Sequence, residues 1–393
     1  MKRWKHWIGP ALLIVPLSWA MMIFLGTSAP CEAKEPYKVG AVFSITGGGS
    51  FLGDPEKKTV EMIRDEINRA GGINGHPLEL VIYDDESDST KCNLAVKKLI
   101  KKDKVPVIIG PSTSGESLAV VGVAEEGRVP LISCAASYKI VTPIESRKWV
   151  FKVAGSDSHV VGKLYDHMKA KGITKVALMT ASTGFGASGR EELLRIAPDY
   201  GITIVADERY GPQDTDLSPQ LTKIRGTQPQ AVVNWSTGPT QILAVKNWRD
   251  LGMESIPLYQ SHGFGNRKNI ELAGKASEGV LLALARVNVG PLLPDTRPQK
   301  KVIMEYTKAY EERYKEPVSS FGGHGWDSLH LAVAALKAVG PDPAKIRDFL
   351  ENTQGFVGMH GIFNFTPQDH CGLSKDDLEM VVVKNGDWAL VEF

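Results

Sequence analysis

The 393-residue sequence lacks any marked excess of charge and has only four cysteines. Its 46 lysine and arginine residues are matched by 45 aspartate and glutamate residues, giving a formal net charge of +1. A balance this close to zero argues against nucleic acid or an anionic membrane as the main partner. The chain also lacks a low-complexity linker, although its length allows two domains that each have a core.

Long apolar runs are absent except near the N-terminus, where residues 8–25 form a run of 18. Basic residues precede this run and small residues end at Ala33, which is the pattern of a secretory signal peptide over residues 1–33. Pro10 and Pro16 interrupt the run, and an uncleaved membrane anchor is the alternative interpretation. A lipoprotein is disfavoured because Pro30 stands where a small residue should precede Cys31. We expect a cleaved, periplasmic protein.

Cleavage after Ala33 would remove three basic residues and Glu32, leaving 43 basic and 44 acidic residues. Three cysteines would remain, Cys92, Cys134 and Cys371, which allow one disulfide and one free thiol. Their spacing does not select a pair. A zinc site that includes His360, His370 and Cys371 lacks paired ligand spacing, and we expect no metal.

Strand and helix patterns alternate from residue 37 onward, which predicts an α/β fold with parallel sheets flanked by helices. The expected strands are 37–43, 78–83, 107–109, 130–133, 176–179, 202–206, 231–234 and 280–284, with further strands at 361–365, 378–383 and 388–393. Helices are expected at 55–70 and 90–102, and the pattern restarts near residue 158, which indicates two lobes. Ligands bind at the carboxyl ends of such strands.

Residues 110–117, GPSTSGES, follow a strand and open a helix. They nearly match a phosphate-binding loop, but Glu116 stands where the lysine must be and would repel a triphosphate. A hydroxyl-rich loop at a helix N-terminus suits a single carboxylate. The alternative is that these residues only cap the helix.

Residues 184–189, GFGASG, match the dinucleotide pattern G-x-G-x-x-G, and Asp207 follows at about the distance of a ribose-binding acid. A dinucleotide-dependent oxidoreductase is therefore the rival interpretation. It is disfavoured because residues 181–183 separate the strand from the first glycine and because an exported chain would meet little free cofactor.

Two further segments follow strands. Residues 133–138, SCAASY, combine small side chains with the Ser137 hydroxyl and leave backbone amides open to a ligand. The acidic run at 84–86 lacks the spacing of a calcium loop and is more typical of a solvated turn. We identify no Ser–His–Asp arrangement, no catalytic residue and no cofactor, and expect no enzymatic activity.

The segments GGING at 71–75 and LELVIYDD at 78–85 resemble the periplasmic leucine/isoleucine/valine-binding proteins of ABC transporters. The resemblance continues through IGPSTSG at 109–115, VPLIS at 129–133, LTKI at 221–224 and EGV at 278–280. It implies a two-lobed clamshell of type I with three crossovers. One lobe would comprise 34–153 plus 284–360, and the other 154–283 plus 361–393.

The same resemblance implies a ligand site between the lobes. The family's carboxylate-binding groups match Ser114, with Thr113 beside it, and Ala135 and Ser137. Leu52, Trp235 and Trp326 are candidates for the apolar lining, with ordinary core packing as the alternative for each.

Two positions depart from the family pattern. A family tyrosine corresponds to Phe185, and the acid that pairs with the ligand's amino group corresponds to His262. The family disulfide positions hold Ser87 and Thr113, so that Cys92 with Cys134 is a possible replacement. We expect the ligand to be an organic acid, including aromatic acids, rather than an aliphatic amino acid. The alternative is that another acid binds the amino group and leucine-type ligands still bind.

The resemblance implies a binding protein that closes around a small carboxylate ligand and docks on the permease subunits of an ABC transporter, and we expect a monomer. A sensory ligand-binding domain is the alternative. A DNA-binding regulator of similar fold is disfavoured, because the signal peptide occupies the place of its helix-turn-helix segment. Neither nucleic acid nor a cofactor is expected as a partner.

Overall fold

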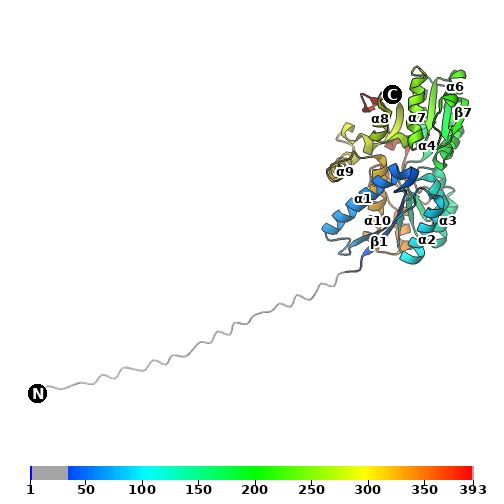
Figure 1. The fold of residues 1–393 in the computed structure, drawn as a ribbon. Coiled ribbons are helices and arrows are strands. Elements are labelled where there is room, and N and C mark those ends of the chain that lie inside the picture. Colours follow the sequence, from blue (N-terminus) through cyan, green and yellow to red (C-terminus); the bar gives the residue numbers. More distant parts are fainter. Residues whose placement is uncertain (2–33, 392–393) are drawn as a thin grey trace. The chain divides into compact units, whose positions relative to one another are not determined.

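The computed structural model describes Met1 and residues 34–391, so the expected signal peptide lies outside the described residues. Two separate sheets organise residues 35–391 (Figure 1). The first has five parallel strands in the order β2-β1-β3-β4-β5. Their bounds are β1 (Tyr37–Phe43), β2 (Leu78–Asp84), β3 (Ile108–Ile109), β4 (Leu131–Ser133) and β5 (Val150–Lys152).

Helices cover both faces of this first sheet because alternate strand residues point to opposite sides. Val39 and Phe43 pack with residues of α1, α10 and α11, whereas Val42 packs with residues of α2 and α3. The helix bounds are α1 (Ser50–Arg69), α2 (Ser89–Lys98), α3 (Ser114–Gly127), α10 (Ser320–Val339) and α11 (Pro343–Glu351). Helix α1 begins five residues before the expected start at Pro55, which lies inside the helix.

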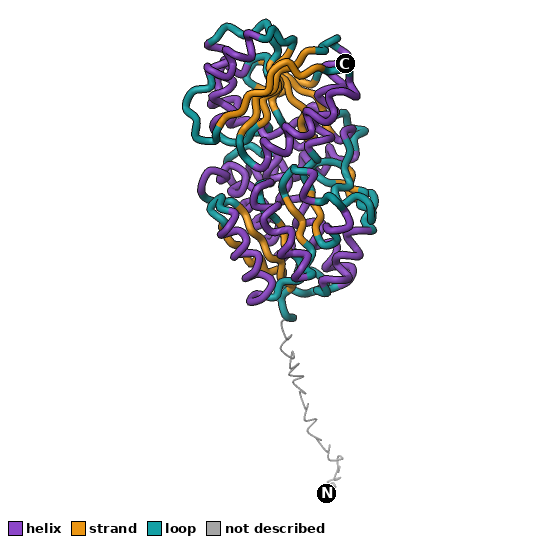
Figure 2. Tube along the Cα trace, turned by 90° about the vertical axis from the view of Figure 1, so that its right-hand side faces the viewer, coloured by secondary structure: helices purple, strands orange, loops and turns teal. Residues whose placement is uncertain are grey.

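The second sheet has seven strands in the order β14-β13-β10-β9-β8-β6-β7, drawn in orange in Figure 2. Five strands are parallel, and β13 and β14 are antiparallel to their neighbours. The bounds are β6 (Lys175–Ala181), β7 (Thr203–Tyr210), β8 (Ala231–Trp235), β9 (Leu258–Gln260), β10 (Leu281–Ala285), β13 (Leu378–Lys384) and β14 (Asp387–Leu390).

Residues of α4 and α5 pack on one face of the second sheet, and those of α6 to α9 on the other. The bounds are α4 (Asp157–Ala170), α5 (Gly184–Ile196), α6 (Ser218–Gly226), α7 (Pro239–Asp250), α8 (Arg267–Ala273) and α9 (Pro298–Tyr314). Helix α9 also contacts α1, since the Tyr306 hydroxyl lies 2.8 Å from the Thr59 hydroxyl. The expected α/β fold with helix-covered sheets is confirmed.

The chain passes between the two sheets three times, after β5, after β10 and before β13. A small hairpin, β11 (Phe356–Val357) with β12 (Ile362–Phe363), precedes the last passage. Phe363, Phe365 and Leu373 pack in the core of the first sheet. The segment 361–373, which the sequence assigned to the second lobe, therefore lies with the first sheet.

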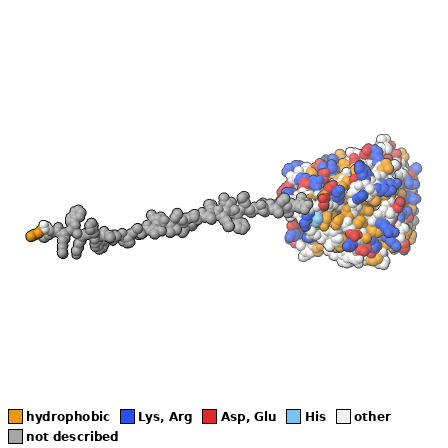
Figure 3. Space-filling view, turned by 90° about the horizontal axis from the view of Figure 1, so that it is seen from below, with side chains coloured by type: hydrophobic (Ala, Val, Ile, Leu, Met, Phe, Trp, Pro, Cys, Tyr) orange, Lys and Arg blue, Asp and Glu red, His pale blue; other side chains and the backbone are white. Residues whose placement is uncertain are grey.

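The surface carries no large field of one sign on the face drawn in Figure 3, where acidic and basic side chains are interspersed. This pattern agrees with the near-neutral charge of the sequence. In the part of the chain that the structure describes, no helix combines the length and apolar character needed to span a membrane.

Candidate functional site

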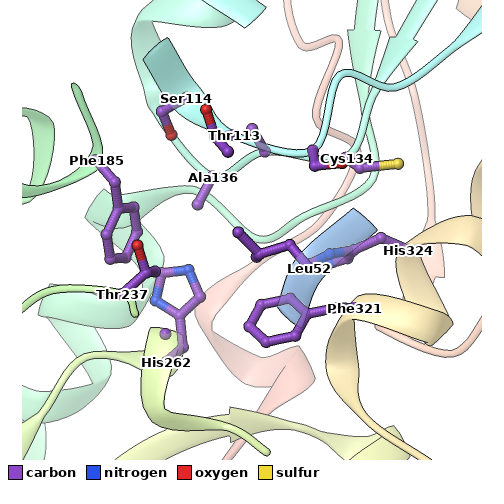
Figure 4. A pocket seen from close by; sticks show the side chains of 13 residues that line it. Leu52, Thr113, Ser114, Cys134, Ala136, Phe185, Thr237, His262, Phe321 and His324 are labelled. Carbon is purple, nitrogen blue, oxygen red and sulfur yellow. The ribbon is translucent and has the colours of Figure 1, made fainter. Parts of the chain in front are cut away.

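A cavity lies where elements of the two sheets meet (Figure 4). The first sheet's side contributes α1, the loops after β3 and β4, and the start of α10. The second sheet's side contributes α5 and the loops after β8 and β9. The lining residues are Leu52, Ser112, Thr113, Ser114, Cys134, Ala135, Ala136, Phe185, Thr237, His262, Gly263, Phe321 and His324.

The start of α3 presents polar backbone groups to this cavity. Thr113 is the N-cap residue and its hydroxyl accepts a hydrogen bond from the Glu116 amide, at 3.4 Å. Ser114 is buried, and its hydroxyl accepts a hydrogen bond from the Ser137 amide at 3.2 Å. Within the described residues, the amides of Ser114, Gly115 and Ala136 donate no hydrogen bond. Two free amides at the N-terminus of α3, together with a third from the loop after β4, are suited to an anion.

A buried lysine fixes the loop that carries Ala136. The Lys152 ammonium donates hydrogen bonds to the carbonyl oxygens of Ala136 and Ser137 and to the Ser156 hydroxyl. Burial lowers the pKa of Lys152. Since these carbonyls are held by the lysine, the loop can present its amide rather than its carbonyl groups to the cavity.

Ser137 does not line the cavity, although the sequence suggested that its hydroxyl binds the ligand. Its hydroxyl lies 2.7 Å from the hydroxyl of Ser188 on α5, and Ser188 in turn donates to Asp157 on α4. This chain of hydrogen bonds joins the first sheet's loop to the second sheet's helices. Ser137 therefore contacts the other lobe, and its amide supports Ser114.

Asp157 provides a test of this buried network. Burial raises the pKa of Asp157 to about 6, although Lys152 and Ser188 act in the opposite direction. The folded protein then retains a proton between pH 4 and 6 that the unfolded chain releases, so this carboxyl lowers stability as pH rises through that window. Relative to wild type, Asp157→Asn should gain about 3 kcal/mol in unfolding free energy between pH 4 and 7.

Guanidinium unfolding of both proteins from pH 4 to 8 measures this difference. Asp199→Asn, at an exposed position beside α5, is the control and should show no such trend. A difference between Asp157→Asn and wild type that is independent of pH would contradict the prediction.

Two ring side chains close the cavity from the second sheet's side. Phe185 lies in the first turn of α5, and His262 begins the short 3-10 helix His262–Phe264 after β9. Their rings meet edge to face with centroids 5.2 Å apart. Burial, followed by the nearby charge of Lys152, lowers the pKa of His262 to about 3. His262 is thus neutral at physiological pH.

The two tryptophans proposed for the apolar lining lie behind it. Trp235 is fully buried at the end of β8 and contacts the rings of Phe185 and His262. Trp326 stacks on His330 at 3.7 Å, outside the cavity. Both tryptophans therefore have ordinary packing roles, which was the alternative given in the sequence analysis.

The sequence analysis missed Thr237, which follows β8, and also Phe321 and His324, which lie near the start of α10. The available signal for the last two was the glycine-rich segment 319–325, SSFGGHG, at a helix start. A Cβ atom at Gly322 would lie 2.4 Å from the Tyr306 hydroxyl, and one at Gly325 would lie 2.9 Å from the Glu56 carbonyl oxygen. These glycines allow α10 to approach α1 and α9 closely.

The glycines at 184–189 also allow close packing of α5 against its neighbours. A Cβ atom at Gly186 would lie 2.0 Å from the Ala181 carbonyl oxygen, and one at Gly189 would lie 2.0 Å from Trp235 Nε1. Asp207, the expected ribose-binding acid, forms an ion pair with Arg190. Helix packing and this ion pair account for the features that suggested a dinucleotide.

The remaining candidate motifs have structural contacts. Cys92 and Cys134 are free and lie in cores on opposite faces of the first sheet, so the suggested bridge between them is wrong. The Asp84 carboxylate accepts hydrogen bonds from the amides of Ile45 and Thr46. Among the described residues, no group of three or more His, Cys, Asp or Glu is arranged to hold a metal ion.

The chain is similar to several known proteins. It is 25% identical over 336 residues to the leucine-, isoleucine-, valine-, threonine- and alanine-binding protein of Pseudomonas aeruginosa, covering 84% of this chain and 86% of that protein. An extracellular ligand-binding receptor from Rhodopseudomonas palustris HaA2 is 30% identical, with a TM-score of 0.84 and coverage of 91% and 100%.

A second solved structure is the branched-chain amino acid transporter substrate-binding protein LivJ of Streptococcus pneumoniae in complex with isoleucine. It is 26% identical, with a TM-score of 0.78 and coverage of 90% of this chain and 98% of that one. The family model described as periplasmic binding protein matches residues 36–387. This match covers nearly all of the described residues and agrees with the motifs at 71–85, and the chain therefore belongs to the periplasmic binding protein family.

Proposed function

We propose that this protein binds a small organic acid between its two lobes and delivers it to the permease of an ABC transporter. The observation that carries the proposal is the composition of the cavity. The free amides of Ser114, Gly115 and Ala136 can bind a carboxylate. The proposal extends to function in the periplasm, as a monomer and without catalytic turnover.

The absence of charged lining residues supports an acid without an amino group. Among the described residues that line the cavity, none is Asp, Glu, Lys or Arg. An ammonium group would therefore enter a partly dry site without a counter-charge, which is costly. The relatives from P. aeruginosa and S. pneumoniae bind amino acids according to their names. We propose that His262 redirects the same architecture to an uncharged or aromatic acid skeleton.

Aromatic side chains support a ring in the ligand. Phe185 and Phe321 lie on different sides of the cavity, with His262 between them and Leu52 above Phe321 in Figure 4. Offset or edge-to-face contact with a ligand ring would add to the burial of apolar area. A thermal-shift screen over amino acids and aliphatic and aromatic acids tests the proposal, because a bound ligand raises the unfolding temperature. Stabilisation by amino acids alone would refute it.

We expect lobe closure on binding, because the cavity is lined from both sides and direct contacts join the two sides. Lys139 beside the first sheet forms an ion pair with Glu191 of α5, and Ser137 contacts Ser188. Small-angle scattering should give a smaller radius of gyration with a saturating acid than without it. An unchanged profile at saturation, shown by calorimetry on the same sample, would contradict closure.

A further inference from the structure

A second cavity lies directly beside the first and has no assigned role. It shares His262 and His324 with the first cavity, so these two imidazoles stand at the boundary between them. Its lining residues are Gly155, Val160, His262, Ala285, Ser320, His324, His360, Leu373, Ser374, Asp377 and Leu378. The second cavity thus adjoins the first at these imidazoles and has the more polar lining.

The imidazoles at this boundary have unused hydrogen-bonding groups. His324 is 5% exposed, and in the described chain its Nδ1 is buried without a hydrogen-bond partner. The Nδ1 of His262 is likewise buried without a partner. His360 stacks on His324 at 4.0 Å and binds Asp327 through Nδ1 at 2.7 Å, while its Nε2 lacks a partner. Buried polar groups are nearly always satisfied, so these nitrogens point to a partner that the protein itself does not provide.

The charges around the second cavity exclude most partners. The Asp377 carboxylate already has partners in the protein. It accepts hydrogen bonds from the amides of Ser374 and Ile362, and its Oδ1 lies 3.5 Å from Nη1 of Arg286. An ammonium group would therefore find no free acid. No Lys or Arg is among the described residues that line this cavity, and the Nδ1 of His360 is already paired with Asp327, so a second carboxylate would find no unpaired cation. Burial lowers the pKa of His324 far below its usual range, which keeps this imidazole neutral.

A neutral hydroxyl group fits this environment. It both donates and accepts a hydrogen bond, and a neutral imidazole offers one nitrogen of each kind. Resting on the proposed function, we infer that the ligand is an acid with a neutral hydroxyl at the end remote from its carboxylate, and that His324 and His262 bind this hydroxyl. The amides near Ser114 then select the acid, and the histidines select the hydroxyl.

Matched pairs of acids test the inference by calorimetry. Each pair differs only in a para hydroxyl: benzoate, phenylacetate and 3-phenylpropanoate against their 4-hydroxy forms, which cover three lengths. In the pair of fitting length, the hydroxyl should improve Kd at least about tenfold, because a site built to bind a hydroxyl rejects the analogue without it. His324→Leu should remove this preference, and His324→Gln should retain part of it.

His330→Leu is the matched control, because His330 lies on the same helix but outside both cavities. It should keep the wild-type ratio. Equal affinities within every pair would overturn the inference. A preference for the hydroxyl that is kept in both His324 variants would overturn it too. Neither result would contradict the proposed function. Failure of all six acids to bind the wild-type protein would overturn the proposed function as well. Near-UV circular dichroism establishes whether each variant is folded. If His324→Leu does not fold, the comparison of acids within each pair on the wild-type protein decides the inference.

Discussion

Ser114→Asp should abolish binding of an acid that the wild-type protein binds in the micromolar range. The new carboxylate would take the place of the ligand's own at the free amides of Ser114, Gly115 and Ala136. Two like charges brought together in a partly dry site cost several kcal/mol. A loss of at least about 3 kcal/mol corresponds to more than a hundredfold in Kd.

The substitution should leave the fold intact. Position 114 begins α3, and an acidic side chain is favourable in the first turn of a helix. Ser114→Ala should have the smaller effect of about 1–3 kcal/mol, the range for hydrogen bonds to charged groups. Ser182→Asp adds the same charge at an exposed position after β6 and should bind as wild type does. Calorimetry that finds unchanged affinity in Ser114→Asp would remove the carboxylate site from consideration.

Much of the fold could be predicted because parallel strands buried on both faces form continuous apolar runs. The run at 37–43 coincides with β1, and those near 78, 231 and 378 fall within one residue of β2, β8 and β13. Strands β5 and β9 were missed; each has three residues, and their last residues are Lys152 and Gln260. Both polar side chains are buried, and only the folded structure provides their partners.

The site could be predicted where it follows a strand and not where it depends on tertiary packing. Thr113, Ser114 and Ala135 line the cavity because the carboxyl ends of β3 and β4 lie together. Phe321 and His324 come from a helix two hundred residues further along, which no local pattern connects to those loops. Ser137 was placed in the right loop, but its hydroxyl turns to Ser188, a choice that depends on the opposite lobe.

His262→Asp should reverse the ligand preference from organic acids to α-amino acids. The wild-type cavity has no acidic lining residue, so we expect leucine, isoleucine and valine to bind much more weakly than aromatic acids of similar size. An aspartate at 262 would provide a counter-charge for an ammonium group while repelling a ligand whose only charge is negative. Leucine should gain about 2–3 kcal/mol, and the acid should lose a similar amount.

His262→Asn is the control for this reversal, since it has nearly the size of aspartate but no charge. It removes the ring contacts with Phe185 and Trp235 in the same way, so any effect common to both variants reflects packing. Calorimetry of the three proteins with leucine, phenylalanine and 3-phenylpropanoate separates the two contributions; the last two compounds differ only in the amino group. Because a free α-amino group carries a full charge, only the aspartate variant should prefer phenylalanine over 3-phenylpropanoate. Micromolar binding of leucine by the wild-type protein, a binding free energy of about −8 kcal/mol, would contradict the organic-acid proposal but not the family assignment.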